Sequence, residues 1–286
     1  MMYFRKLLRK LLLFLLTIPI LFFIFFPILW LFSASLSNQV ELYAVPPHWI
    51  PQHPTLQNYL DIIFPNLAAS SVPRTFAVSL LNSFKIASAV TLICIVIGSL
   101  AAYALVRIPF KYNHSIQVAI LGTRMIPEVS LIIPLFIIAS SFQLINKPIV
   151  LIISYMSFAL PYAIWMMAAF FQTVPIELEE AARLDGCTRL GILLRVVMPI
   201  SLPGLTSTAM FVFLVAWDEF FYALIFTSTL AAKTVPVAIA EFVGRYTVNI
   251  NGMMAGGILA ALPPVLLGLI FQRYIVSGMT AGAVKG

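Results

Sequence analysis

The chain has 286 residues, of which 62% are hydrophobic and 9% are charged. Soluble domains usually contain about 25% charged residues, so this composition and the mean hydropathy of +1.03 exclude an ordinary soluble domain. The net charge of +7 does not indicate a nucleic-acid partner. The basic residues lie at the ends of apolar runs, where the positive-inside rule places them in membrane proteins. The composition therefore predicts a polytopic membrane protein in contact with a lipid bilayer.

Uncharged or nearly uncharged runs predict six membrane spans, because about 20 apolar residues cross the hydrocarbon core. The first run follows a basic cluster and resembles a signal peptide, but its apolar part is too long for one, and Pro19 and Pro27 are more typical of a span. We expect an all-α integral membrane protein built as a single permease domain over residues 1–286. The expected spans are about 11–32, 83–106, 116–142, 149–171, 202–230 and 253–272.

The basic amino terminus predicts that both termini lie in the cytoplasm. The loops that this orientation places inside carry Arg107, Lys111 and Arg183 among their basic residues. The outer segments are then residues 33–79 and 228–252. The expected location is the cytoplasmic (inner) membrane, with multiple passes.

The loop 174–199 between the fourth and fifth expected spans is long and charged. Pro175 suits the first turn of a helix, and the acids after it favour the positive end of the helix dipole. Gly186 permits a sharp turn, and Thr188 can cap a second helix that ends before Pro199. Chemistry alone leaves two interpretations open: a partner-binding helix, or an amphipathic surface helix that only orders the loop.

The residues of this loop also carry a family resemblance. Glu180-Ala181-Ala182, three residues, Gly186, nine residues and then Val196-Val197-Met198-Pro199 resemble the EAA signature of ABC importer permeases. The departures are Val and Met at two apolar positions.

Further segments resemble the carbohydrate-uptake (maltose-type) permeases, in the smaller of their two permease subunits. These are PQHPTLQNY at 51–59, Met125-Ile126-Pro127, Phe158-Ala159-Leu160-Pro161, Trp217-Asp218-Glu219-Phe220 and the terminal TAGAVKG.

The resemblance implies four kinds of partner: a second homologous permease subunit, two ABC ATPase subunits, an external solute-binding protein and the bilayer. It implies that ATPase coupling is carried by Glu180, Ala181, Ala182 and Gly186, with Leu184 and Asp185 as neighbours. No GxxxxGK[ST] sequence is present. We therefore expect no enzyme activity and no bound cofactor in this chain, with Mg-ATP on the partner ATPases. Cys94 and Cys187 lack metal-ligand spacing, so no metal site is expected.

Polar residues within the expected spans are the candidates for a substrate path. Arg124 and Glu128 are four residues apart, which on a helix places both on one face. A substrate role and a structural ion pair are both open for them. Trp217, Asp218 and Glu219 resemble a family segment that usually has Asn at the second position. Aromatic rings stack on sugar faces and carboxylates accept hydroxyl hydrogen bonds, but a structural carboxylate at Asp218 stays open.

The outer residues Lys233, Glu241 and Arg245 are candidates for contact with the binding protein, against the default of a solvated loop. The expected cargo is a sugar or glycosidic solute, such as a di- or oligosaccharide, trehalose, sucrose or glucosylglycerol, moved by alternating access. The alternatives are an ABC permease for a non-sugar solute, an ion-coupled secondary transporter, which would not need the 174–199 loop, and an intramembrane enzyme. His48, His53 and His114 are expected in loops, which weighs against the enzyme.

Overall fold

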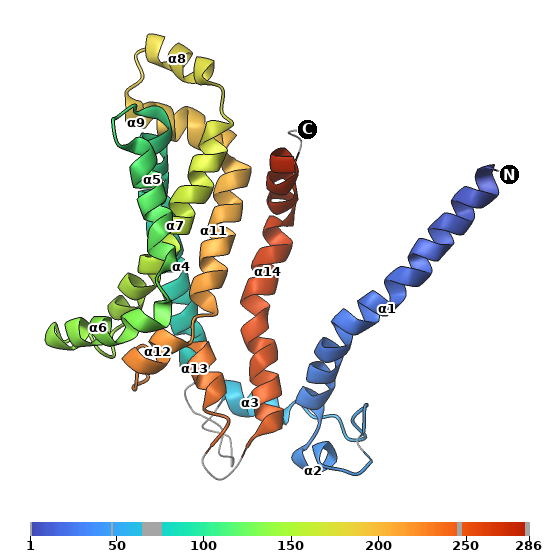
Figure 1. Cartoon of the computed structure of the whole chain (residues 1–286). Helices are drawn as coiled ribbons and strands as arrows, with labels where there is room; N and C mark the ends of the chain where they lie inside the picture. Colours follow the sequence, from blue (N-terminus) through green and yellow to red (C-terminus); the bar gives the residue numbers. More distant parts are fainter. Residues whose placement is uncertain (1, 47, 65–75, 245–247, 284–286) are drawn as a thin grey trace. The chain divides into compact units, whose positions relative to one another are not determined.

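The computed structural model describes residues 2–46, 48–64, 76–244 and 248–283 (Figure 1). The regular secondary structure of these residues is helical, with no β-strand beyond one isolated bridge between Val243 and Val248. The predicted all-α class is confirmed for this part of the chain. The longer helices are α1 (Met2–Leu36), α4 (Phe76–Arg107), α5 (Asn113–Gly122), α6 (Glu128–Ser141), α7 (Pro148–Gln172), α11 (Leu202–Trp217) and α14 (Ile250–Ala283).

Short helices connect these. They are α2 (Gln39–Leu42), α3 (Gln57–Ile63), a 3-10 turn η2 (Thr123–Met125), α8 (Ile176–Leu184), α9 (Arg189–Ile192), a π-helical turn η3 (Leu193–Val197), α10 (Met198–Ile200), α12 (Phe221–Phe226) and α13 (Val235–Ala240). His114, which was expected in a loop, lies in the first turn of α5.

Among the described residues, four unbroken helical stretches are long and apolar enough to cross a membrane. They are Leu13–Leu36, Phe76–Arg107, Pro148–Gln172 and Ile250–Arg273. Two further pairs of helices qualify only together: Asn113–Met125 with Glu128–Ser141, bent by 90°, and Arg189–Ile200 with Leu202–Trp217, bent by 85°. The described residues thus contain between four and six candidate spans, and the count of six stays a prediction.

The break between α5 and α6 is caused by Pro127. A proline disfavours the helical conformation of the residue before it, and Ile126 is extended, with φ −76° and ψ 123°. Pro127 itself has ψ 126°, so α6 begins only at Glu128. The expectation that one helical face carries Arg124 and Glu128 is therefore wrong, because the helix stops between them.

The segment before α11 also differs from the expectation, because its helix continues further than expected. We expected its helix to end before Pro199, but the helix continues through Pro199 to Ile200. The π-helical turn at Leu193–Val197 precedes the proline. A proline ring clashes with the carbonyl four residues earlier in a regular α-helix, and the wider π turn relieves that clash.

The helices fall into two compact units, Met1–Ala77 with Ile239–Ala261, and Val78–Ala238 with Leu262–Gly286. In the first unit, two asparagine side chains bind the carboxyl-terminal end of α1. Nδ2 of Asn251 donates to the carbonyls of Ala34 (3.0 Å) and Ser37 (2.8 Å), and Nδ2 of Asn58 donates to Ser35 (2.8 Å) and Ser37 (3.0 Å). The last carbonyls of a helix have no partner within it, so these bonds stabilise the end of α1.

In the second unit, α7 is the central helix, and α11 packs closely against it. The contact needs glycine at position 204, because a Cβ there would lie 2.1 Å from the Phe170 ring of α7. Buried apolar side chains of α4, α7 and α11, including Val90, Leu151 and Val212, fill the core. This packing fixes the ends of α7, on which the candidate sites depend.

The Gly204→Ala variant tests the close contact of α7 and α11. We expect it to destabilise the protein by about 1–3 kcal/mol, the usual cost of overpacking, seen as a lower unfolding temperature of the detergent-solubilised protein. Gly268→Ala on α14 is the control, because nothing lies within 4 Å of a Cβ there. Adding Phe170→Ala to Gly204→Ala should restore stability. Equal stability of the Gly204→Ala and Gly268→Ala proteins would contradict the contact.

Candidate functional site

Helix α8 lies at one end of the second unit, beyond the ends of α7 and α11 (Figure 1). Its outward side chains belong to the segment that was expected to couple to an ATPase. Leu184 is 90% exposed, and Glu180, Ala181, Asp185 and Gly186 are also exposed. Ala182 is half-buried against an apolar cluster. The two alanines of the EAA segment therefore differ, with Ala181 on the outer side and Ala182 on the inner side of α8.

The end of α8 is a glycine-terminated turn. Gly186 has φ +84°, which L-residues with side chains rarely adopt. The backbone N–H of Cys187 donates to the carbonyl of Ala182 (3.0 Å), and that of Gly186 donates to Arg183 (3.1 Å). This pair of bonds is a Schellman motif. Thr188 then caps α9 through a bond from the N–H of Gly191 to its Oγ1 (3.2 Å).

The inner side of α8 is held by a buried carboxylate, Glu179, which is 2% exposed. Nε of Arg107, at the end of α4, donates to Oε1 of Glu179, and the hydroxyl of Tyr103 donates to Oε2 at 2.9 Å. Nη2 of Arg107 also donates to the carbonyls of Phe171 (3.0 Å) and Val174 (2.6 Å), at the end of α7. We call Tyr103, Arg107 and Glu179 the α8 anchor, because they join α4, α7 and α8.

Beyond an acid at position 179, no sequence pattern indicated this anchor. The acids at 177, 179 and 180 all lie in or near the first turn of α8, where a helix dipole favours each of them equally. Their difference follows from rotation about the helix axis, which turns Glu179 inward and Glu177 and Glu180 outward. An arginine about 70 residues earlier in the chain cannot be matched to one of three acids by spacing.

A second polar cluster lies at the Pro127 break between α5 and α6, where α7 and α12 also meet. Nη2 of Arg124 donates to Oε1 of Glu128 at 2.8 Å, across the Pro127 break. The Arg124 guanidinium lies 4.4 Å from the centre of the Tyr162 ring on α7. The hydroxyl of Tyr222 on α12 donates to the backbone carbonyl of Glu128 at 3.0 Å. The cluster therefore joins η2, α6, α7 and α12.

The residues at the break between α11 and α12 have different roles. Trp217 is 3% exposed and stacks on Phe213, with ring centres 5.6 Å apart, so it belongs to the core. The carboxylate of Glu219 accepts hydrogen bonds from the N–H groups of Tyr222 (2.8 Å) and Ala223 (3.2 Å) and so caps α12. Of Trp217, Asp218 and Glu219, only Asp218 is exposed.

Lys233, a candidate for contact with the binding protein, is buried at 8% exposure. Its carbonyl accepts a hydrogen bond from Nδ2 of Asn82 (3.1 Å). Glu241 is exposed. Arg245 lies outside the described residues. Within the described part of the chain, no group of three or more His, Cys, Asp or Glu side chains is arranged to hold a metal ion.

Exposed apolar helices long enough to cross a membrane, two bent helix pairs and a charged helix at one end are typical of a helical membrane transport protein. Residues 94–281 match the family model described as binding-protein-dependent transport system inner membrane component. The chain belongs to this family, and the predicted membership is confirmed. It is a permease subunit of a binding-protein-dependent ABC importer.

Three relatives align over 91% of the chain. The sulfoquinovosyl glycerol transport system permease protein SmoH of Agrobacterium fabrum is 39% identical, with 89% of its length covered. The trehalose/maltose transport system permease protein MalG of Thermococcus litoralis is 38% identical (91% covered). The trehalose transport system permease protein SugB of Mycobacterium tuberculosis is 39% identical (92% covered). These homologues are permeases of sugar ABC importers.

The fold is also that of solved importers. A chain of a bacterial ABC transporter for import of the acidic polysaccharide alginate aligns with a TM-score of 0.78 at 18% identity, covering 94% of this chain and 97% of that chain. A chain of the MetNI methionine ABC transporter aligns with a TM-score of 0.55 at 17% identity, covering 72% and 94%. At these identities the likeness concerns the fold alone.

Arg107→Met tests the α8 anchor. It leaves the Glu179 carboxylate buried without its cation, which costs about 3–5 kcal/mol, and we expect a much lower unfolding temperature of the purified permease. Removing both charges, in Arg107→Met with Glu179→Leu, should recover most of the loss. Arg183→Met is the control, because Arg183 is an exposed arginine on α8 itself. An Arg107→Met protein as stable as this control would contradict the anchor.

Proposed function

We propose that this chain carries a sugar or a glycosidic solute across the membrane by ATP-driven alternating access, together with a second, homologous permease. In this proposal both bent helix pairs cross the bilayer, which gives six spans with both termini in the cytoplasm. The basic residues at 5–10, Arg107 and the segment 174–199 then lie inside, as the positive-inside rule requires. The membrane is the inner membrane of the cell.

The observation that carries the proposal is the two-sided character of α8. Its outer side presents Ala181 and Leu184 without cover, and Ile176 and Leu178 of the same helix are also exposed. A group of exposed apolar side chains is typical of a binding surface, whereas a single one is not. Its inner side is tied to α4 and α7 through Glu179. A partner that moves α8 therefore pulls directly on two candidate spans. We assign this partner as one of two ATPases, which bind Mg-ATP and hydrolyse it.

The cargo follows from the relatives and from the cluster at the helix breaks. The relatives are named for trehalose, maltose and sulfoquinovosyl glycerol, all of which contain a sugar ring with several hydroxyl groups. Asp218 and Glu128, which is 43% exposed, supply acceptors for hydroxyl groups. Arg124 supplies donors beside the Tyr162 ring. A membrane span that is broken, and that exposes polar groups at the break, is a recurrent way to build a transport site.

The proposal also assigns the outer surface to a solute-binding protein that delivers the cargo. The outer segments 33–79 and 228–252 are the candidates for this contact, with Glu241 as an exposed charge. The burial of Lys233 in this structure makes it a weaker candidate. The assembly is then this chain, its permease partner, two ATPases and the external binding protein.

Reconstitution of the complete transporter in proteoliposomes tests the proposal. We expect ATP-dependent uptake of at least one of trehalose, maltose and sulfoquinovosyl glycerol, delivered by the binding protein. Leu184→Ser on α8 should reduce uptake and binding-protein-stimulated ATP hydrolysis about tenfold or more, the scale of one lost apolar contact of 1.4 kcal/mol or above.

Leu16→Ser is the matched control, because Leu16 is an exposed leucine on α1 that lies outside α8, the polar cluster and the outer segments. Equal uptake by both variants would contradict the role of α8. Uptake of none of the three saccharides would contradict the sugar cargo.

A further inference from the structure

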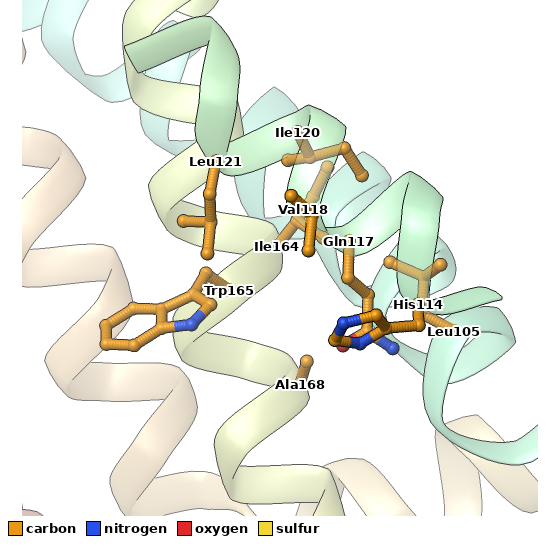
Figure 2. A pocket seen from close by; sticks show the side chains of 9 residues that line it. All are labelled: Leu105, His114, Gln117, Val118, Ile120, Leu121, Ile164, Trp165 and Ala168. Carbon is orange, nitrogen blue, oxygen red and sulfur yellow. The ribbon is translucent and has the colours of Figure 1, made fainter. Parts of the chain in front are cut away.

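A cavity of about 150 Å³ lies between α5 and α7, apart from the residues assigned so far. Figure 2 shows its wall, in which the rings of Trp165 and His114 flank Ala168. The lining residues are Leu105, His114, Gln117, Val118, Ile120, Leu121, Ile164, Trp165 and Ala168. A cavity of about this volume accommodates one benzene ring in a protein core, so its size suits one six-membered ring rather than a disaccharide.

The cavity wall combines an aromatic side chain, two polar side chains and several aliphatic side chains. Trp165 offers an aromatic face that is 55% exposed. Gln117 and His114, at neighbouring turns of α5, carry polar atoms that can donate and accept hydrogen bonds. The other lining side chains are aliphatic, and none carries a full charge. An aromatic face opposite neutral hydrogen-bonding groups suits an uncharged ring with hydroxyl groups, since such a ring has apolar C–H faces and a polar edge.

The cavity continues a row of rings on α7. Phe158, Tyr162 and Trp165 are spaced by four and three residues, so they lie on one face of the helix. The row covers about 10 Å along the axis, at 1.5 Å per residue. Exposure rises along it, from 3% at Phe158 to 55% at Trp165. Arg124 lies over the Tyr162 ring, so this aromatic row links the cluster at the helix breaks with the cavity.

The far end of the row lies next to the α8 anchor. Leu105 precedes Arg107 by two residues on α4, and Ala168 precedes Phe171 by three on α7. Both Arg107 and the carbonyl of Phe171 belong to the hydrogen bonds around Glu179. In the orientation proposed above, this is the cytoplasmic end of the path.

We propose that this cavity is an inner subsite that binds one pyranose ring of the transported saccharide on its way into the cytoplasm. Trp165 stacks on the ring, and Gln117 and His114 bind its hydroxyl groups. The subsite rests on the proposed sugar cargo and extends it, because it assigns a binding place to α5 and α7 beyond the helix breaks.

Protection of a single cysteine from a maleimide tests the subsite in the assembled, nucleotide-free transporter. Val118→Cys, at a cavity-lining position that is 55% exposed and has no assigned contact to the saccharide, is made in a background with Cys94→Ala and Cys187→Ser, so that no native thiol of this chain reacts. Trehalose, maltose and sulfoquinovosyl glycerol are the probes, and sorbitol, an acyclic polyol, is the control ligand. Ser115→Cys is the matched control position, because Ser115 is exposed three residues away on α5 and does not line the cavity.

We expect the saccharide that the complex imports to slow labelling of Val118→Cys and to leave Ser115→Cys unchanged, while sorbitol slows neither. Adding Trp165→Leu should raise the saccharide concentration needed for protection about tenfold, and Trp165→Phe should raise it less. Adding Phe142→Leu, which removes an exposed ring outside the cavity, should leave it unchanged.

The outcomes separate the two proposals. Uptake of a saccharide without protection of Val118→Cys overturns the subsite and leaves the sugar cargo standing. Equal protection by sorbitol also overturns it, because the ring would then play no part. Protection that is unaffected by Trp165→Leu removes the stacking that defines the subsite. If none of the three saccharides is imported, the sugar cargo fails and the subsite fails with it.

Discussion

The buried ion pair of Arg107 and Glu179 is the interaction on which the functional end of the molecule depends. Burying two charges is costly, and an apolar pair of the same volume often gives equal or greater stability. The pair is therefore better explained by geometry than by stability. Arg107 binds Glu179 on α8 and two carbonyls at the end of α7 at once, so α4, α7 and α8 meet in one fixed arrangement. A helix held only by apolar contacts could slide, whereas directed hydrogen bonds define its position.

This constraint connects the sites along the second unit. From the anchor, α7 carries the aromatic row of Phe158, Tyr162 and Trp165 toward the cluster at the helix breaks, where Tyr162 lies under Arg124. The same helix packs on α11 at Gly204. Helix α7 contacts the anchor, α11 and the polar cluster at the helix breaks. A displacement of α8 is therefore passed along α7 to the helix breaks, in the manner of a shear motion between packed helices. In our account this is how an ATPase outside the bilayer changes access to the sugar path.

Much of this architecture could be predicted from the sequence, and the failures have physical causes. Apolar runs located the helices, and the spacing from Glu180 to Pro199 identified the family, because both are local patterns. A proline lies at or near each of the two bends, but the two prolines act differently, since Pro127 ends a helix while Pro199 is accommodated by a π turn. The sequence also could not distinguish the roles of residues that are adjacent in the chain. Trp217, Asp218 and Glu219 differ in burial because α11 ends between them, and Glu179 differs from Glu180 only by rotation about α8.

The central claim is that α8 and α7 move as one body when ATP binds. Spin labels at Glu177→Cys on α8 and Ile153→Cys on α7, both exposed positions, measure it in the assembled transporter lacking its native cysteines. The distance distribution between the labels should be the same in the nucleotide-free and ATP-bound states. In a variant with Arg107→Met and Glu179→Leu, it should broaden on ATP binding. A shift of the distribution on ATP binding with the anchor intact would contradict the account.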